Sequence, residues 1–480
     1  MAKAGLPSDF LWGFATASYQ IEGSVDVDGR GPSIWDVFCD KGGKIADGSS
    51  GAIACDSYRR TAKDIELLRS CGAQAYRFSL SWSRIIPLGG RNDPINQKGL
   101  DHYVKFTKDL LDAGIVPLIT LFHWDLPQAL HERYGGMLNK QEFVADFANY
   151  ARIVFEALGP YIKYWVTFNE PWCSAVLGYN TGIFAPGRTS DRSKSSEGNS
   201  TTECWVVGHS ILVAHGAAAK IHREEFKSRY GGEIGIVLNG DWAEPWDSES
   251  KEDIEACERR LEFAIGWFAD PIYHGDYPAS MRKQLGVRLP KWEEKDIALV
   301  KGSNDFYGMN TYCANYVRHR TSLPQDDDFE GNVDLLFENQ KGEKIGPDTQ
   351  SAWLKPYPPG FRKLLNWIYH RTGRPKILVT ENGTSIKNEN DHKLPEILDD
   401  DFRVTYYKDY IHAMAEAVAE DGVNVKAYFC WSLLDNFEWA DGYETRFGVT
   451  YVDYEDEQKR YPKKSAKEVK SIFEKYVGKA

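Results

Sequence analysis

The chain has 480 residues and a formal net charge of -12, with 42% hydrophobic and 27% charged residues, which are ordinary values for a globular protein. Because the charge is acidic and no basic cluster offsets it, nucleic acid and anionic membranes are excluded as expected partners. Neither an N-terminal signal segment nor a membrane-spanning stretch is expected, and the scattered cysteines contain no C-x-x-C pair for a zinc site. These features predict a cytoplasmic protein without a metal.

Apolar runs of strand length alternate with amphipathic helical patterns along the chain. The expected strands are residues 10–17, 75–82, 116–124, 164–169, 233–239, 305–312, 376–381 and 425–433. The expected helices are residues 62–72, 99–113, 142–158, 204–226, 256–270, 361–371, 402–420 and 463–476. Several strand runs are apolar on both faces, which is typical of parallel strands covered by helices. Eight strands, each followed by a helix, predict a single (β/α)8 TIM barrel domain over residues 1–480.

A doubly wound open sheet is the alternative fold. It would need a glycine-rich turn for phosphate after the first strand, and the segment GFATA at 13–17 is not such a turn. Long loops are expected after five of the strands, at residues 19–57, 189–202, 323–350, 385–400 and 435–454. A barrel gathers these loops at its C-terminal face, where barrel enzymes keep their active sites.

Two glutamates lie where an expected strand gives way to a loop. Glu170 is part of the segment TFNEP at 167–171, and Glu381 is part of VTENG at 379–383. Either glutamate alone could be an ordinary carboxylate at the start of a loop. Two carboxylates at strand ends, far apart in sequence, could instead form an acid and nucleophile pair that cleaves a glycosidic bond.

Other expected strand ends carry polar and aromatic side chains. They are Gln20, Glu22, Arg77, His123, Trp124, Asn169, Asn310, Tyr312, Trp431, Glu438 and Trp439. Taken singly, a histidine or tryptophan here could belong to the core, and an arginine could form a structural salt bridge. Together, amides, an imidazole, a carboxylate and indoles could bind several hydroxyls and stack on one ring face. The set therefore predicts a sugar site.

The two glutamate segments resemble the signatures of glycoside hydrolase family 1. The resemblance extends to FLWGFATASYQIEG at 10–23, YRFS at 76–79, FHWDLP at 122–127 and WSLLDNFEW at 431–439, and it covers about residues 6 to 475. The resemblance is strongest to the intracellular fungal β-glucosidases of that family. It implies a retaining enzyme that needs no cofactor.

The resemblance also implies a role for individual residues. Glu381 would be the nucleophile, oriented by Arg77 and Tyr312, and Glu170 would be the general acid and base. The sugar to be cleaved would be bound by Gln20, His123, Trp124, Asn169, Asn310, Trp431, Glu438, Trp439 and Phe447. The leaving group, or aglycone, would be bound by Trp172, Leu177, Asn239 and Trp353.

Two positions narrow the expected substrate. Plant thioglucosidases of the family carry Gln in place of Glu170, so an O-glycosidase is implied. The 6-phospho-glycosidases lack the residue that matches Glu438, whose charge would repel a phosphate, so a neutral sugar is implied. The expected reaction releases terminal β-D-glucose from cellobiose, short gluco-oligosaccharides and aryl glucosides, with β-galactosidase or β-fucosidase side activity and transglycosylation. A sugar-binding barrel without catalysis would not need both glutamates, and an inverting hydrolase would need them farther apart.

Overall fold

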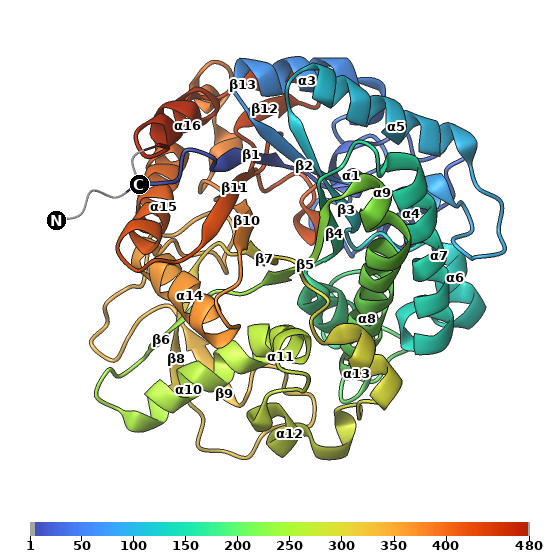
Figure 1. Cartoon of the computed structure of the whole chain (residues 1–480). Coiled ribbons are helices and arrows are strands. Elements are labelled where there is room, and N and C mark those ends of the chain that lie inside the picture. The colour runs from blue at the N-terminus through green and yellow to red at the C-terminus, as the bar shows by residue number, and fades with distance from the viewer. Residues whose placement is uncertain (1–4, 479–480) are drawn as a thin grey trace.

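The computed structural model describes residues 5–478. Within these residues, eight parallel strands close into a barrel in the order β1, β11, β10, β7, β5, β4, β3, β2, and helices surround it (Figure 1). The barrel strands are β1 (Leu11–Ala15), β2 (Ala75–Ser79), β3 (Val116–Phe122), β4 (Tyr164–Asn169), β5 (Glu233–Asn239), β7 (Tyr307–Asn310), β10 (Ile377–Asn382) and β11 (Val425–Trp431). Each expected strand overlaps one of them, which confirms the (β/α)8 barrel.

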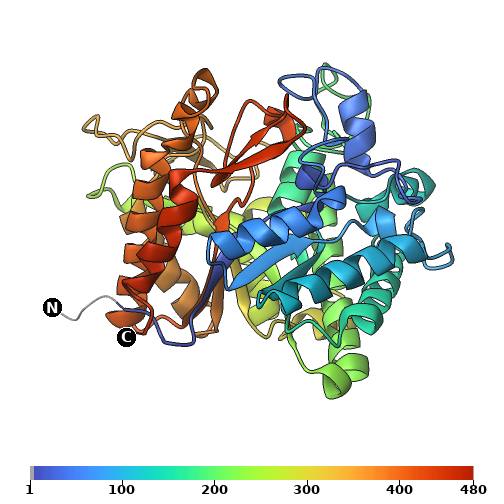
Figure 2. The same ribbon diagram turned by 90° about the horizontal axis from the view of Figure 1, so that it is seen from above.

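The first and last barrel strands close the sheet. Ala15 of β1 lies opposite Trp431 of β11 on one side and Arg77 of β2 on the other. Near the two ends of the chain, the Leu6 amide donates to the Tyr476 carbonyl oxygen at 2.8 Å. The red helix α16 (Lys464–Glu474) packs beside the orange helix α15 (Asp401–Ala419) in the same region (Figure 2).

A long helix or helix pair follows each barrel strand, as expected. Besides α15 and α16, these long helices are α3 (Thr61–Ser70), α5 (Gln97–Asp112), α7 (Lys140–Leu158), α8 (Glu203–Ile221), α10 (Lys251–Leu261), α11 (Trp267–Tyr273) and α14 (Pro358–Arg371). Shorter helices are α1 (Ser18–Ile21), α2 (Ile34–Asp40), α4 (Trp82–Ile85), α6 (Gln128–Tyr134), α9 (Lys227–Tyr230), α12 (Ala279–Leu285) and α13 (Glu294–Val300).

Helix α5 illustrates how the sequence pattern produces these elements. Its buried residues Leu100, Tyr103, Thr107 and Leu110 recur at helical spacing, so they share the face that packs on the barrel. The chain leaves the helix through Gly114, whose φ of 76° lies in the left-handed region that glycine adopts without steric cost.

One helical stretch corrects an expectation. Residues Glu203–Tyr230, which include α8 and α9, are long and apolar enough to cross a membrane, although no such stretch was expected. In this structure 83% of the stretch's most apolar window is buried inside the protein, where α8 packs against α7 and α13. The apolar composition therefore reflects a core helix that is covered on most sides.

Two small sheets in the loops were not expected from the sequence. A three-stranded sheet joins β6 (Trp242–Pro245), β8 (Ala314–His319) and β9 (Val333–Leu336), and it packs against α10. A hairpin of β12 (Thr450–Asp453) and β13 (Lys459–Pro462) follows the last barrel strand. Both sheets belong to connections that leave the C-terminal ends of barrel strands, and they build up that face of the barrel.

Candidate active site

A cavity of about 510 Å³ lies at the C-terminal ends of the barrel strands. Its walls include most of the residues that the sequence proposes for the site: His123, Trp124, Glu170, Trp172, Leu177, Asn239, Asn310, Tyr312, Trp353, Glu381, Trp431, Glu438, Trp439 and Phe447. Three others, Gln20, Arg77 and Asn169, are buried behind the wall and hydrogen bond to residues that line it. Glu22, which the sequence also places at the end of the first strand, does not line the cavity and instead accepts from Arg84 Nε at 3.1 Å and from the Tyr103 hydroxyl at 2.6 Å. Apart from Glu22, the structure therefore brings the proposed residues together.

Glu381 is held by two donors near the end of β10. Arg77 Nη1 lies 2.5 Å from Glu381 Oε1, and the Tyr312 hydroxyl donates to Oε2 at 2.5 Å. Burial raises the pKa of Glu381, whereas the charge of Arg77 and the hydrogen bond from Tyr312 oppose that rise. These contacts favour the ionised carboxylate, as a nucleophile requires.

Glu170 follows β4 directly and has a left-handed backbone conformation, with φ of 48°, which is uncommon for a residue with a side chain. Asn310 Nδ2 donates to Glu170 Oε1 at 2.6 Å, and the Cys173 thiol donates to Oε2 at 3.0 Å. Burial and the charge of Glu381 raise the pKa of Glu170 to about 8. Of the two carboxyl groups, Glu170 is therefore the one that holds a proton near neutral pH.

A chain of hydrogen bonds determines how the amides between these groups are oriented. Arg77 Nη2 donates to Asn169 Oδ1 at 2.6 Å, and Asn310 Nδ2 donates to the same oxygen at 3.0 Å. Asn169 Nδ2 then faces His123 Nε2 at 3.0 Å, so this imidazole nitrogen accepts. Burial lowers the pKa of His123 well below its ordinary value, so the neutral ring carries its proton on Nδ1.

The cavity has an aromatic wall beside these polar groups. The His123 ring stacks near Trp431 and Trp439, with centroid distances of 6.1 and 5.9 Å. Trp124 Nε1 donates to the Asn169 carbonyl oxygen at 2.9 Å, and this bond holds the indole in place. Flat apolar faces next to hydrogen-bonding groups suit a sugar ring, which has both C–H faces and hydroxyls.

Glu438 is held by Gln20, whose Nε2 lies 3.3 Å from Oε2. The same nitrogen donates to Asn436 Oδ1 at 2.9 Å, while Gln20 Oε1 has no hydrogen-bond partner among residues 5–478. Burial, with the charge of Asp441, raises the pKa of Glu438 well above its ordinary value. The charge that the sequence argument assigns to Glu438 is therefore reduced by burial, which weakens repulsion as the reason for excluding a phosphate.

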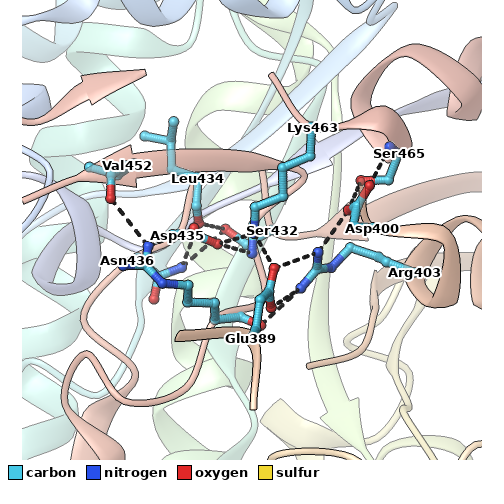
Figure 3. Close-up of polar contacts among 12 residues, drawn as sticks. Glu389, Asp400, Arg403, Ser432, Leu434, Asp435, Asn436, Val452, Lys463 and Ser465 are labelled. Atoms are coloured by element: carbon cyan, nitrogen blue, oxygen red, sulfur yellow. Dashed lines mark hydrogen bonds and ion pairs between the residues drawn. The ribbon is translucent and has the colours of Figure 1, made fainter. Parts of the chain in front are cut away.

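A buried network of ion pairs holds the loop that carries Glu438 (Figure 3). Lys463 Nζ contacts Asp435 Oδ1 at 2.9 Å and Glu389 Oε1 at 2.6 Å, and Arg403 contacts Glu389 at 2.8 Å and Asp400 at 2.7 Å. The side chains of Lys463, Arg403 and Asp435 are 0% exposed. The network joins the loops after β10 and β11 to the starts of α15 and α16, so it fixes the position of the loop after β11, which carries Glu438.

The outer part of the cavity contains the proposed aglycone residues. Trp172 packs edge-on against Phe329 with centroids 5.9 Å apart, and the Arg260 guanidinium lies 5.9 Å from the Trp172 ring. Trp353 is 49% exposed and packs edge-on against Tyr312. The arrangement offers aromatic surface at the cavity mouth.

Sequence reasoning missed several residues of the cavity. They are Cys173, Ile183, Phe184, Asp241, Arg260, Glu330 and Phe337, together with their neighbours in the same loops. Asp241 Oδ1 accepts from the backbone amides of Tyr312 and Cys313 at 2.9 and 3.0 Å, and it thereby fixes the turn that presents Tyr312. Only Cys173 had a signal in the sequence, its position three residues after Glu170.

Comparison with known proteins agrees with the fold and the site. The family model of glycosyl hydrolase family 1 matches residues 2–476. β-Glucosidase 1B of Phanerodontia chrysosporium is 56% identical over 98% of this chain and 86% of its own length. Among solved structures, a family 1 β-glucosidase of Humicola insolens in complex with glucose is 68% identical with a TM-score of 0.99, covering 100% of both chains. β-Glucosidase 2 of Trichoderma reesei in complex with Tris is 65% identical with a TM-score of 0.95, covering 98% of this chain and 99% of that one.

A closed barrel with a buried pair of carboxyl groups at its C-terminal face defines a glycosidase of the barrel type. The chain belongs to glycosyl hydrolase family 1, and it is a retaining enzyme of that family. The residues described in the structure contain no group of three or more His, Cys, Asp or Glu side chains that could hold a metal ion.

Proposed function

We propose that the protein is a β-glucosidase that removes terminal β-D-glucosyl residues from cellobiose, short gluco-oligosaccharides and aryl β-glucosides. One observation carries the chemistry: two buried carboxyl groups share a cavity but have opposite environments. Glu381 is held by a guanidinium and a phenol, whereas burial and the charge of Glu381 raise the pKa of Glu170 to about 8. Such a pair supplies one nucleophile and one acid.

The reaction would take two steps. In the first, Glu170 gives its proton to the glycosidic oxygen, the bond from that oxygen to the anomeric carbon breaks, and Glu381 bonds to the anomeric carbon. In the second, the ionised Glu170 takes a proton from water, the water oxygen bonds to the anomeric carbon, and the bond to Glu381 breaks. A sugar hydroxyl that replaces this water would give transglycosylation.

The lining of the cavity supports this substrate class. His123 and Glu438 line the cavity and offer hydrogen bonds to the hydroxyls of a neutral sugar, and Trp431 offers a face for its ring. Gln20 supports this contact from behind the wall through its hydrogen bond to Glu438. We expect the enzyme also to hydrolyse β-galactosides and β-fucosides if a hydroxyl that differs from that of glucose removes only one of these contacts. The complex of the Humicola insolens relative with glucose supports glucose as the sugar. We further propose that the enzyme works in the cytoplasm, which agrees with its eight cysteines, all within the described residues, being free.

The roles of the two glutamates can be tested by substitution. Glu381→Ala should lower turnover by a factor on the order of 10⁴ or more, because the covalent intermediate cannot form. Glu170→Ala should damage cellobiose hydrolysis far more than hydrolysis of a nitrophenyl glucoside, whose leaving group needs little protonation. Azide should restore the Glu170→Ala variant and yield the β-glucosyl azide, whereas the Glu381→Ala variant should yield the α-anomer.

Specificity needs a separate measurement. A panel of nitrophenyl β-glycosides with cellobiose alongside would rank glucose, galactose and fucose by kcat/KM. Wild-type protein that binds these sugars without hydrolysing any of them would show instead a sugar-binding barrel. Release of the α-anomer as the first product would contradict the retaining reaction.

A further inference from the structure

Cys173 is the one thiol in contact with the proposed acid and base among the described residues. It begins a π-helical turn, Cys173–Leu177, three residues after Glu170, and it lines the cavity with 7% of its surface exposed. Its Sγ lies 3.0 Å from Glu170 Oε2. Burial and the charge of Glu170 raise the pKa of this thiol well above its ordinary value, so it keeps its hydrogen and can donate.

The other oxygen of Glu170 is restricted to accepting. Arg77 can only donate, so the Asn169 atom at 2.6 Å from it must be the amide oxygen. The Asn310 atom that meets this oxygen at 3.0 Å must therefore be the amide nitrogen, and the same nitrogen lies 2.6 Å from Glu170 Oε1. A proton on Glu170 Oε1 would therefore face the Asn310 amide nitrogen, which is a donor and cannot accept it.

The catalytic proton is thereby assigned to Glu170 Oε2, the oxygen that faces Cys173. A thiol is both a weak donor and a weak acceptor, so it can accept from the protonated Oε2 and donate to the ionised one. We propose that Cys173 is a positioning residue for the acid and base catalyst, holding Glu170 Oε2 while the proton leaves and returns. This inference rests on the proposed role of Glu170.

The consequence for the reaction can be stated step by step. When Oε2 gives its proton to the glycosidic oxygen, the S–H group turns toward the new carboxylate and donates to it. When the carboxylate takes a proton from water, the thiol no longer needs to donate and again lies beside the protonated Oε2. The charged and titratable groups that also act on Glu170 are Glu381 and Arg77, with Tyr312 and Glu438 within electrostatic reach, and the Cys173 variants keep all four of these residues.

The test compares Cys173→Ala with Cys173→Ser, because serine keeps a hydroxyl that donates and accepts. Cys204→Ala serves as the control, since Cys204 is also a buried thiol but hydrogen bonds to Asn180 and Ser200 instead of to the catalytic pair. For each variant, kcat/KM for cellobiose is measured against pH, together with kcat for cellobiose and for a dinitrophenyl glucoside. Thermal unfolding is recorded in parallel.

Loss of the donor should leave the ionised Glu170 less stable and so raise its pKa. The alkaline limb of kcat/KM for Cys173→Ala should move upward by about half a pH unit, and kcat for cellobiose should fall roughly threefold to tenfold, as expected for one weak hydrogen bond. Cys173→Ser should stay closer to the wild type in both measurements, and Cys204→Ala should match the wild type. Should the alanine variant fail to fold, Cys173→Val fills the same space without a donor and gives the same comparison.

Several outcomes would overturn the inference. An alkaline limb that stays in place in Cys173→Ala, even with a lowered Tm, would mean that the thiol only fills space. An equal shift in Cys204→Ala would mean that the contact with Glu170 is not the cause. If Glu170→Ala hydrolyses cellobiose as the wild type does, the proposed function fails and takes this inference with it, whereas an inactive Glu170→Ala beside an unchanged Cys173→Ala removes only the inference.

Discussion

Tyr312→Phe removes a single hydroxyl that donates to the proposed nucleophile. The hydroxyl lies 2.5 Å from Glu381 Oε2 within a buried site. A hydrogen bond to a charged group contributes about 1.5–3 kcal/mol, so kcat/KM should fall roughly 10- to 150-fold. The pKa of Glu381 should rise when the donor is lost, and because the nucleophile must be ionised, the acidic limb of the pH profile should move to higher pH.

The assay is steady-state hydrolysis of a nitrophenyl glucoside from acidic to neutral pH. Tyr307→Phe is the matched control: Tyr307 begins β7, the strand that precedes Tyr312, and its buried hydroxyl has no hydrogen-bond partner among residues 5–478. Its removal should leave kcat/KM within about twofold, since no partner is left unsatisfied. If Tyr312→Phe keeps the wild-type rate and the wild-type acidic limb, the hydroxyl does not stabilise Glu381 and the reasoning is refuted.

Three further predictions concern other parts of the site. Because burial and the charge of Glu381 raise the pKa of Glu170 to about 8, and the acid must be protonated, kcat/KM for cellobiose should fall as pH rises through about 8; a fall complete below pH 6 would contradict this. Lys463→Met should lower the free energy of unfolding in urea by about 3–5 kcal/mol, because it leaves buried carboxylates unpaired, whereas Lys464→Met, which breaks only exposed ion pairs, should leave it close to the wild-type value. Trp172→Ala should weaken binding on the aglycone side by about 1–3 kcal/mol, which should change KM for cellobiose and the inhibition constant for glucose, while hydrolysis of a small aryl glucoside stays within about tenfold. A folded variant that is inactive on the aryl glucoside would place Trp172 in the catalytic machinery.

The barrel could be predicted because its strands leave a local trace in the sequence. A strand buried on both faces reads as a continuous apolar run, as residues 116–122 do, and a helix reads as a period of three to four. Alternation of the two patterns then determines the architecture. Because barrel strands all end at one face, the positions of Glu170 and Glu381 at strand ends also predicted that they share a site.

The remaining features depend on contacts that no local pattern records. Lys463 and Lys464 are neighbours in sequence, yet the first side chain is 0% exposed and the second 43%. Gln20 reaches Asn436, which is 416 positions away. The contact between Cys173 and Glu170 depends on the π-helical turn after β4, and a turn of that kind follows from tertiary packing more than from composition.

The closure of the barrel by β1 and β11 governs the order in which the enzyme can mature. Synthesis delivers β1 long before its partner, because Leu11–Ala15 pair with residues 427–431. Until then one edge of the growing sheet is open and can pair with another chain. Trp431 and Glu438 belong to the same late segment, so a nascent chain that already carries Glu170 and Glu381 still lacks one side of the sugar pocket. Bound sugar can therefore stabilise the barrel only after the last strand is in place, so it gives no protection to the open sheet before then.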